Sequence, residues 1–460
     1  MYKIDFDKPL TVHFIGIGGI SMSGLAEVLL KQNFRVSGSD IASTSITGHL
    51  KDLGATVFLG HSGSNITKEL ELVVYTAAIK PDNVEFLSVQ AHSIPMIDRA
   101  ELLGQIMSNY PHSIGVAGTH GKTTTTSMMS QLLLDADKDP TVSVGGMLDI
   151  LGGNIRVGDS SYFITEACEY ANSFLKFYPS VAIVLNVEAD HLDFFKDLED
   201  IRRSFRRYLE NVPENGTIII NSDIIDYETL VEGLKCKVIT YGSSENHPDY
   251  TAKNISFNKF GCATFDLYLK GQKLESIAIN STGTHNIYNA IAAIAAAGAM
   301  GIEAATIKNS FVNFVGPKRR FEYKGSLKGV TIIDDYAHHP TEIEATLKAA
   351  KKIDHHALWV VFQPHTYSRT KSFLNEFAKA LSIADHIILA DIYAAREKDL
   401  GEIHAKDLLL KLQPLNEQCH YFSSFDEIEI FILENCIPDD VLITMGAGNI
   451  HLIGEDLLLG

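Results

Sequence analysis

Paired cysteines, long hydrophobic runs and basic residues are all scarce in this sequence of 460 residues. The five cysteines are scattered, and no two of them form a C-x-x-C pair. This spacing indicates neither a disulfide framework nor a zinc site, so we expect reduced thiols. The cysteines are Cys168, Cys236, Cys262, Cys419 and Cys436.

No apolar run is long enough to cross a bilayer. The longest, around Ala290 to Met300, is rich in alanine and too weakly hydrophobic to be a membrane span. Residues 1 to 9 carry charges and no apolar signal core. We therefore expect a cytoplasmic protein without membrane insertion.

The shortage of positive charge limits the ligands. Lysine and arginine number 39 against 57 acidic residues, a formal net charge of −18. Such a field repels polyphosphates, so we expect no nucleic acid partner, and any phosphate ligand needs a local pocket.

The composition is that of an ordinary globular protein, with 45% hydrophobic and 21% charged residues. A chain of this length is expected to fold into about three domains. Breaks in the pattern at Asn109 to His112 and at Phe314 to Phe321 divide the chain. We predict an α/β protein with domains at residues 1–109, 110–315 and 316–460.

Short apolar runs alternate with helical patterns in each domain, the order expected of parallel sheets. The second domain also contains alternating segments that predict an accessory antiparallel sheet. The expected strands are Thr11 to Ile15, Phe34 to Ser37, Val57 to Leu59, Leu72 to Tyr75, Ile114 to Ala117, Tyr162 to Thr165, Val181 to Val187, Tyr250 to Phe257, Ala263 to Leu269, Val330 to Ile333, Leu358 to Phe362, His386 to Ala390 and Val441 to Met445, with a helix from Ser23 to Gln32.

A glycine turn, Gly118-Thr119-His120-Gly121-Lys122-Thr123, lies between an expected strand and an expected helix. Backbone N–H groups at such a helix N-terminus bind phosphate oxygens, with the lysine on the β and γ phosphates and the threonine on Mg²⁺. The first glycine of the strict P-loop pattern is missing, because Val116 stands there. The alternatives are a nucleotide site and an ordinary tight turn.

A second glycine-rich turn, from Gly16 to Ser21, follows the first strand, and Asp40 ends the next strand. This pattern is typical of a dinucleotide site whose carboxylate binds ribose hydroxyls, which makes NAD the simplest ligand. Ser21 replaces the third glycine of the fingerprint. Close packing of helix on strand is the alternative.

Acidic and imidazole groups follow two strands of the second domain. Glu166 and Glu169 follow one, and Asp190 and His191 follow the other. Strand ends face the ligand crevice, and Mg²⁺ needs few protein ligands besides water and phosphate. The alternative is that these residues cap the following helices.

The third domain repeats this placement. Asp335, His338 and His339 follow one strand, His365 and Arg369 follow another, and Arg319 and Arg320 lie in the hinge before them. Arg320 could reach a transferring phosphoryl group on domain closure. Solvated arginines and histidines bonded to backbone are the alternatives.

Six motifs occur in an order and spacing that together resemble one known family, the Mur ligases. The resemblance covers essentially the whole chain. The motifs are Ile15-Gly16-Ile17-Gly18-Gly19-Ile20, Gly118 to Thr126, Asn186-Val187-Glu188-Ala189-Asp190-His191, Gly283-Thr284-His285-Asn286-Ile287-Tyr288-Asn289, Arg319-Arg320-Phe321-Glu322 and Asp335 to Pro340.

The resemblance implies a UDP-binding Rossmann-like domain, a central P-loop ATPase-type domain and a C-terminal Rossmann-like domain. It implies a ligase that uses ATP and Mg²⁺, with Mn²⁺ as an alternative, to join L-alanine to UDP-N-acetylmuramate through an acyl phosphate, for peptidoglycan synthesis. The first glycine loop would then hold UDP pyrophosphate and not NAD. The chain would act as a monomer or a homodimer.

The resemblance also implies roles for particular residues, carried over by position. The catalytic residues would be Lys122, His191 and Arg320, and the cation ligands Thr123, Glu166 and His191. ATP would be bound by Gly118, Thr119, His120, Gly121, Lys122, Thr123, Thr124, His285, Asn286, Asn289, Arg320 and Asp335. The UDP-sugar would be bound by Gly16, Gly18, Gly19, Ile20, Ser21, Asp40, His61 and Arg99, and the amino acid by His338, His365 and Arg369.

Three departures from the family pattern limit this transfer. Ser21 stands where glycine is usual, and Thr366 stands where some relatives have a basic residue. Several Mur ligases carry a carbamylated lysine, whereas the stretch 201–207 here has four arginines and no lysine. A second cation would have to be held differently.

Three rival functions stay open from the sequence. A recycling ligase that attaches a preformed tripeptide to the same sugar nucleotide is the nearest. An NAD-dependent oxidoreductase would use the first glycine loop, and a nucleotide sensor would bind ATP without turnover.

Overall fold

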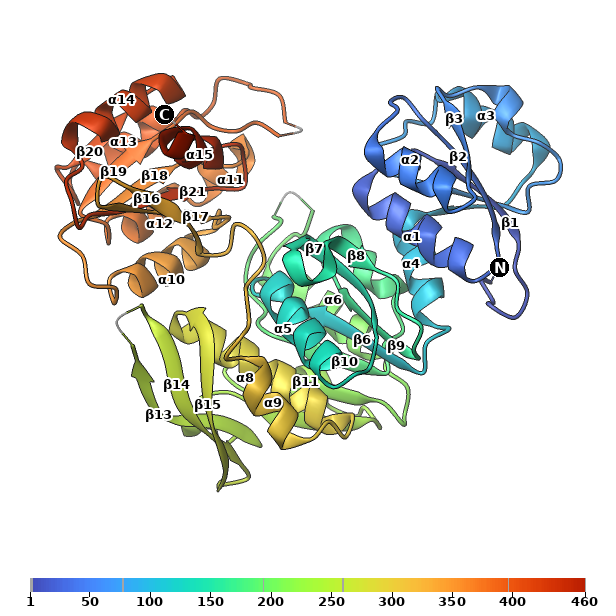
Figure 1. Ribbon diagram of the computed structural model, residues 1–460, viewed down its shortest axis with the longest axis horizontal. Coiled ribbons are helices and arrows are strands. Elements are labelled where there is room, and N and C mark those ends of the chain that lie inside the picture. The colour runs from blue at the N-terminus through green and yellow to red at the C-terminus, as the bar shows by residue number, and fades with distance from the viewer. Residues whose placement is uncertain (1–2, 77, 193, 259, 396, 460) are drawn as a thin grey trace. The chain divides into compact units, whose positions relative to one another are not determined.

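The computed structural model describes residues 3–76, 78–192, 194–258, 260–395 and 397–459. The chain divides into two compact units, residues 1–250 with 292–307 and residues 251–291 with 308–460, and each is described by itself (Figure 1). Within the described residues, every helix is too short or too polar to span a membrane. All five cysteines are free thiols, as predicted.

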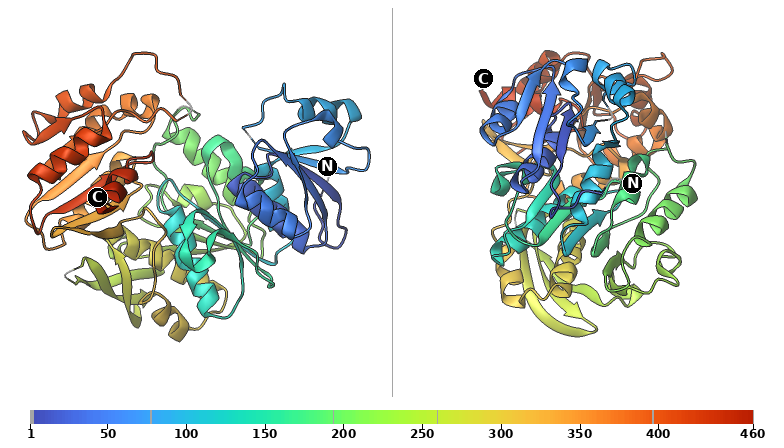
Figure 2. Two further views of the ribbon diagram at one scale, coloured as in Figure 1. Left: turned by 45° about the horizontal axis from the view of Figure 1, so that its top comes forward. Right: turned by 90° about the vertical axis from the view of Figure 1, so that its right-hand side faces the viewer.

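The N-terminal part of the first unit, blue in Figure 2, contains a parallel five-stranded sheet, whose order is β3-β2-β1-β4-β5. This is the strand order of a Rossmann half, in which ligands bind beyond the C-terminal strand ends. Its elements are β1 (Thr11–Ile15), α1 (Ile20–Lys31), β2 (Arg35–Asp40), α2 (Ser45–Asp52), β3 (Thr56–Leu59), η1 (Gly63–Asn65), β4 (Leu72–Tyr75), α3 (Val84–His92), β5 (Met96–Asp98) and α4 (Arg99–Met107).

The rest of the first unit is built on a second sheet, in the order β12-β11-β10-β6-β9-β7-β8. All neighbours are parallel except β8, which is antiparallel to β7. The elements are β6 (His112–Ala117), α5 (Lys122–Asp135), β7 (Thr141–Leu148), η2 (Asp149–Leu151), β8 (Gly153–Arg156), β9 (Tyr162–Glu166), η3 (Tyr170–Lys176), β10 (Val181–Val184), α6 (Leu198–Leu209), β11 (Thr217–Asn221), α7 (Glu228–Val231), β12 (Lys237–Tyr241) and η4 (Ser244–Asn246).

The accessory antiparallel strands that the sequence predicts are present. β14 and β15 form an antiparallel pair, and Tyr250 at the start of β13 pairs with Tyr241 of β12. The elements here are β13 (Tyr250–Phe257), β14 (Cys262–Leu269), β15 (Gln272–Thr282), α8 (Thr284–Ala299) and α9 (Ala304–Ser310).

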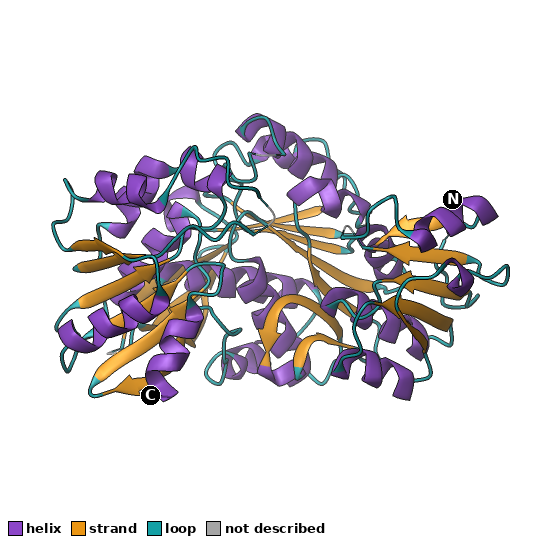
Figure 3. Cartoon of the chain, turned by 90° about the horizontal axis from the view of Figure 1, so that it is seen from above, coloured by secondary structure: helices purple, strands orange, loops and turns teal. Residues whose placement is uncertain are grey.

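The C-terminal sheet has the order β16-β17-β21-β18-β19-β20, with only β16 antiparallel among the described pairs. Alternate residues of β18 enter different cores: Val360 packs in one cluster and Trp359 and Val361 in another. Both faces of the sheet are thus covered by helices (Figure 3), which explains the unbroken apolar run of this strand. The elements are β16 (Glu322–Leu327), β17 (Val330–Asp335), α10 (Pro340–Ala350), β18 (Leu358–Phe362), α11 (Tyr367–Ser372), α12 (Leu374–Leu381), β19 (His386–Leu389), α13 (Ala405–Leu412), β20 (Cys419–Tyr421), α14 (Phe425–Asn435), β21 (Val441–Met445) and α15 (His451–Leu459).

Several predicted element bounds differ from the structure, most of them by one or two residues, and β2 ends at Asp40, three residues beyond the predicted Ser37. Helix α1 begins at Ile20, three residues early, because Gly16 adopts φ +85° and lets the turn close sooner. Strand β10 ends at Val184 and does not reach Val187, because Asn186 turns to bond the loop beside it. The α/β fold class is confirmed, and the proposed domain boundaries stay predictions.

Candidate active site

The turn between β6 and α5 has the shape that a phosphate-binding loop needs. Gly118 and Gly121 have φ of +147° and +83°, and a Cβ on Gly118 would lie 2.9 Å from the Cβ of Leu185. Gly121 is the N-cap of α5, and no side chain caps this helix. The first N–H groups of α5 are therefore not taken by a capping side chain and can bind an anion.

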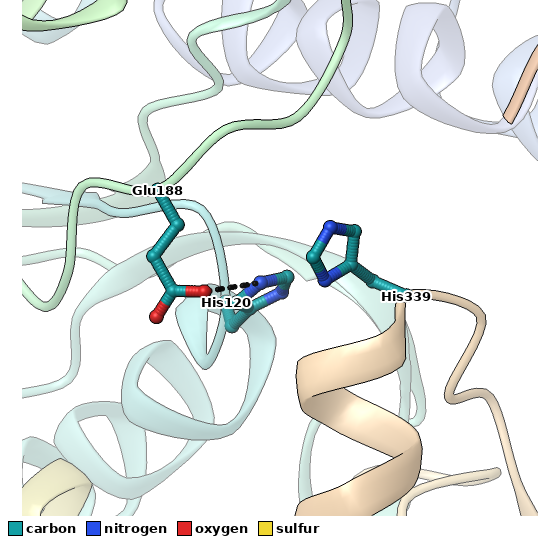
Figure 4. Close-up of side chains that lie close together, drawn as sticks. All are labelled: His120, Glu188 and His339. Carbon is teal, nitrogen blue, oxygen red and sulfur yellow. Dashed lines mark ion pairs between the residues drawn. The ribbon is translucent and has the colours of Figure 1, made fainter. Parts of the chain in front are cut away.

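Residues that follow β10 make hydrogen bonds to this turn. The side chain of Asn186 accepts a hydrogen bond from the N–H of His120 at 2.8 Å and donates one to its carbonyl at 3.1 Å. The N–H of Glu188 donates to the hydroxyl of Thr119, and the Glu188 carboxylate lies 3.5 Å from the His120 ring (Figure 4). Asn186 was not among the predicted site residues, although it lies in one of the quoted motifs.

Lys122, the first residue of α5, is folded back over its own loop. Its Nζ donates to the carbonyl oxygens of Gly118 at 2.5 Å and Thr119 at 3.1 Å. It also lies 3.0 and 3.2 Å from the two carboxylate oxygens of Glu169, a buried residue. Burial alone would lower the pKa of Lys122, but the charge and hydrogen bonds of Glu169, together with the charges of Cys168 and Glu166, outweigh burial and raise that pKa.

The three predicted cation ligands lie near Lys122 or its partner Glu169. Glu166, at the end of β9, accepts a hydrogen bond from the N–H of Gly145 at 2.5 Å, and its charge acts on Lys122. Thr123 is a buried residue of the first turn of α5. His191 Nε2 lies 3.8 Å from Glu169 Oε1. A carboxylate and a hydroxyl beside a phosphate loop fit the hard oxygen donors that Mg²⁺ prefers, so these residues suit the cation.

The alternative that these residues cap the following helices fails for Glu169. Glu169 occupies the N-cap position of η3, but its side chain makes no capping hydrogen bond. Asp190 accepts a hydrogen bond from the N–H of His191 at 2.7 Å. The carboxylate of Glu169 instead faces the lysine.

The first glycine loop is closed around Asp40. Asp40 Oδ2 accepts a hydrogen bond from the N–H of Gly18 at 2.8 Å, and a Cβ on Gly18 would lie 2.8 Å from that oxygen. At the other end of the loop, Arg99 donates to the hydroxyl of Ser21 at 3.1 Å. Gly19 is the N-cap of α1, and no side chain caps that helix, while Ile20 is exposed. The loop can therefore present backbone N–H groups to a pyrophosphate.

The two hinge arginines of the second unit differ in their surroundings. Arg319 donates to Asp334 at 2.8 Å and to the carbonyl oxygens of Gly446 and Gly448 at 2.7 and 3.0 Å. These contacts fix the backbone before β16. Arg320 lies 3.8 Å from Glu342. Neither arginine is an exposed, solvated side chain.

Asp335 ends β17 and is almost fully buried. Its two oxygens accept hydrogen bonds from the N–H groups of Phe321 and Ala337, both at 2.7 Å. Burial raises the pKa of this carboxyl to about 6, although the charge of Arg320 and the two hydrogen bonds oppose the rise.

The three residues predicted to bind an amino acid lie together. The rings of His338 and His365 are 5.8 Å apart, and Arg369 lies 3.1 Å from Nδ1 of His365. Burial lowers the pKa of His338 to about 4, so its ring is neutral at pH 7. Its neighbour His339 caps α10, so His339 has a structural role at the start of that helix.

His338 presents a lone pair. Its Nδ1 faces two acceptors, the carbonyl of Tyr336 at 3.0 Å and the carboxylate of Glu342 at 3.3 Å. That nitrogen therefore carries the single proton of the neutral ring, and Nε2 is an acceptor.

The predicted adenosine residues lie at the start of α8. Asn286 donates to Ser281 and to the carbonyl of Thr282, both at 2.8 Å, and Asn289 donates to Asn286 at 2.9 Å. His285 lines a pocket of about 350 Å³. The other lining residues are Gly283, Thr284, Thr341, Glu344, Ala345, Lys348, Ala349 and Lys352.

The fold and these loops define a class of α/β proteins that combine a Rossmann-type glycine loop with a second glycine turn at the start of a helix. Family models match three stretches of the chain: the Mur ligase family catalytic domain at residues 11–111, the Mur ligase middle domain at 116–297 and the Mur ligase glutamate ligase domain at 319–448. The chain belongs to the Mur ligase family.

Curated relatives match over the full length. The chain is 54% identical over 458 residues to UDP-N-acetylmuramate--L-alanine ligase of Lachnospira eligens and 56% identical to the protein of that name from Agathobacter rectalis, with 100% of each chain covered. Among solved structures, UDP-N-acetylmuramate-alanine ligase MurC of Thermotoga maritima matches with a TM-score of 0.79 and 28% identity over 98% of each chain. A murein peptide ligase of Psychrobacter arcticus matches with a TM-score of 0.68 and 26% identity, also over 98% of each chain.

Proposed function

We propose that this chain is an ATP-dependent ligase that joins L-alanine to the lactyl carboxylate of UDP-N-acetylmuramate, giving UDP-N-acetylmuramoyl-L-alanine, ADP and phosphate. The observation that carries the proposal is the loop from Gly118 to Lys122, whose uncapped helix N-terminus and half-buried lysine suit a triphosphate. Relatives at 54 and 56% identity over the whole chain support the choice of substrates.

The chemistry follows from the inertness of a carboxylate. An amine cannot displace an oxide ion, so the acid first takes the γ-phosphoryl group of ATP, and the bond from that phosphorus to the ADP oxygen breaks. The amine of L-alanine then attacks the acyl phosphate, and phosphate leaves from the tetrahedral intermediate. Two easier steps replace one difficult step.

The central loop is suited to the first step. Backbone N–H groups at the start of α5 would bind the phosphates, and Lys122 and Arg320 would stabilise the charge on the transferring group. Thr123, Glu166 and His191 would hold Mg²⁺, which supplies charge neutralisation at the phosphate oxygens when bound. His285, Asn286 and Asn289 would contact the adenosine, and Asp335 would help to hold ATP.

The other two substrates have their own sets of residues. The loop from Gly16 to Ser21 would bind the UDP pyrophosphate, with Asp40, His61 and Arg99 on the nucleotide sugar. The lone pair on His338 Nε2 suits the ammonium group of an amino acid, and Arg369 suits its carboxylate. His191 could take the amine proton only when it is not bound to a cation.

These roles are divided between the two units of the chain, so three substrates have to be brought into one complex before the reaction. Orientation within that complex would supply much of the rate enhancement. Closure and opening of the domains are then candidates for the slowest step.

The test is phosphate release measured with UDP-N-acetylmuramate, L-alanine, ATP and Mg²⁺, and with each omitted in turn. The proposal expects release only with all four. A product formed faster with the tripeptide L-alanyl-γ-D-glutamyl-meso-diaminopimelate than with L-alanine would favour the recycling ligase. Reduction of a nicotinamide would favour the oxidoreductase, and tight ATP binding without turnover would favour the sensor.

The cytoplasmic location, the monomeric or dimeric state and the use of Mg²⁺ stay predictions.

A further inference from the structure

A buried carboxylate with no assigned role lies in the N-terminal part of the first unit, the part that we propose binds UDP. Glu85, in the first turn of α3, has no exposed surface. Burial alone would raise its pKa, but the His13 imidazole 3.8 Å away and the hydrogen bonds from Ser39 and Asn65 outweigh burial and lower the pKa to about 2. The group is therefore a permanent buried anion, which the fold tolerates only when it is fully paired.

The two oxygens of Glu85 face different donors. Oε1 accepts from the amide of Asn65 at 2.6 Å and from the N–H of Ser62 at 3.3 Å. Oε2 accepts from the hydroxyl of Ser39 at 2.5 Å and lies 3.1 Å from Nδ1 of His61. Glu85 thus ties the loop after β3 to the end of β2.

These contacts decide the tautomer of His61. Its Nδ1 also lies 2.9 Å from the Ser39 oxygen, whose only proton is already donated to Glu85. Nδ1 therefore faces two acceptors and must carry a proton. In the neutral ring the opposite nitrogen, Nε2, then has a lone pair.

The position of His61 allows this lone pair to contact a bound ligand. His61 follows β3, beside Asp40 at the end of β2, on the edge of the sheet where nucleotides bind. Its side chain is 17% exposed, whereas Glu85 is sealed off. The imidazole can reach a ligand, and the carboxylate can act only through the imidazole.

We propose that Glu85 is a positioning residue that fixes His61 as a hydrogen-bond acceptor for a donor group of the bound nucleoside. The donor is either the imide N–H of uracil or a ribose hydroxyl. This inference rests on the proposed function, because it takes the ligand of this sheet edge to be a uridine nucleotide.

The substitution Glu85→Gln is expected to change the tautomer of His61. The carbonyl oxygen of the new amide must face Asn65 and the N–H of Ser62, because both are donors. Its NH₂ group then faces Ser39 and His61 and donates to Nδ1. The proton of His61 moves to Nε2, and the acceptor becomes a donor at unchanged size and shape.

The experiment compares binding of UDP, CDP and 2′-deoxy-UDP by calorimetry at pH 8, above the usual imidazole range. CDP lacks the imide N–H, and 2′-deoxy-UDP lacks one hydroxyl. We expect the unmodified protein to bind UDP roughly tenfold more tightly than whichever analogue lacks the donor, and Glu85→Gln to abolish or reverse that preference. Loss of discrimination against CDP assigns the donor to the base, and loss against 2′-deoxy-UDP assigns it to the ribose.

Glu69→Gln is the matched control. It makes the same chemical change at an exposed carboxylate outside the contacts of Glu85, so the preference should not change. The nitrogen chemical shifts of His61 in the unmodified protein provide a measurement that needs no variant. They should show a protonated Nδ1 and an unprotonated Nε2.

Equal affinity for all three nucleotides, an unchanged preference in Glu85→Gln, or a protonated Nε2 would overturn the inference while the ligase proposal stands. Failure of UDP to bind at all would overturn both, and only that result would count against the sugar-nucleotide half of the proposed function.

Discussion

The ammonium group of Lys122 lies 3.0 Å from the carboxylate of Glu169, and both side chains are largely shielded from water. The lysine that we assign to the phosphates of ATP is thus paired within the protein. It has to leave this partner when a phosphate arrives. Two predictions follow from that exchange, one for each residue.

Lys122→Ala should all but abolish formation of the acyl phosphate, with a fall in kcat of about a thousandfold, because the charge at the transferring group loses its fixed counter-charge. Binding of UDP-N-acetylmuramate, measured by calorimetry without ATP, should not change. Lys235→Ala, at an exposed ion pair with Glu214, serves as the control and should behave as the unmodified protein. Equal loss of turnover and of sugar-nucleotide binding would refute the division of roles between the two glycine loops.

Glu169→Gln should make Mg²⁺-free ATP bind about tenfold more tightly, since the substitution removes both the competitor for Lys122 and a negative charge that repels phosphate. The dissociation constant is measured in the presence of a chelator. Glu210→Gln, at an exposed pair with Arg206, is the control and should leave this constant unchanged. Weaker binding in Glu169→Gln would mean that the ion pair holds the lysine in its binding position and does not compete with ATP.

The buried carboxyl of Asp335 should make stability depend on pH. Its folded pKa of about 6 lies above the ordinary 3.8, so the folded state binds the proton more tightly than the unfolded state. The contribution of Asp335 to the free energy of unfolding is therefore present at low pH and is lost as pH rises from about 4 through 6, by about 3 kcal/mol over the whole range.

Denaturant unfolding of the unmodified protein and of Asp335→Asn between pH 5 and 7 checks this direction. The variant should be less stable at pH 5, because one of the two N–H groups bonded by Asp335 loses its acceptor. The difference between the two proteins should shrink as pH rises. A difference that stays constant over this range would show that Asp335 does not titrate there.

Local sequence signals predicted the strands well where an apolar run coincides with a buried strand. Thr11–Ile15, Leu72–Tyr75, Leu358–Phe362 and Val441–Met445 have the predicted bounds. The β10 prediction failed because the apolar run continues past the point where the chain leaves the ladder. What ends the strand is a tertiary contact of Asn186, and hydropathy carries no signal for it.

The site was predictable only in part for a similar reason. Glycine turns are local, so both loops could be found from the sequence. The partners Glu169 and Glu85 lie 47 residues from Lys122 and 46 from Ser39, and only the folded sheets bring them together. Nothing in the sequence around Glu85, an acid in the first turn of a helix, separates it from an ordinary dipole-stabilising residue.

The central claim is that the γ-phosphoryl group of ATP is transferred to the sugar-borne carboxylate before the amine attacks. The most direct measurement uses UDP-N-acetylmuramate with ¹⁸O in its lactyl carboxylate, together with L-alanine, ATP and Mg²⁺, and determines the label by mass spectrometry. The account predicts one ¹⁸O atom in each phosphate released. Phosphate without label would contradict it.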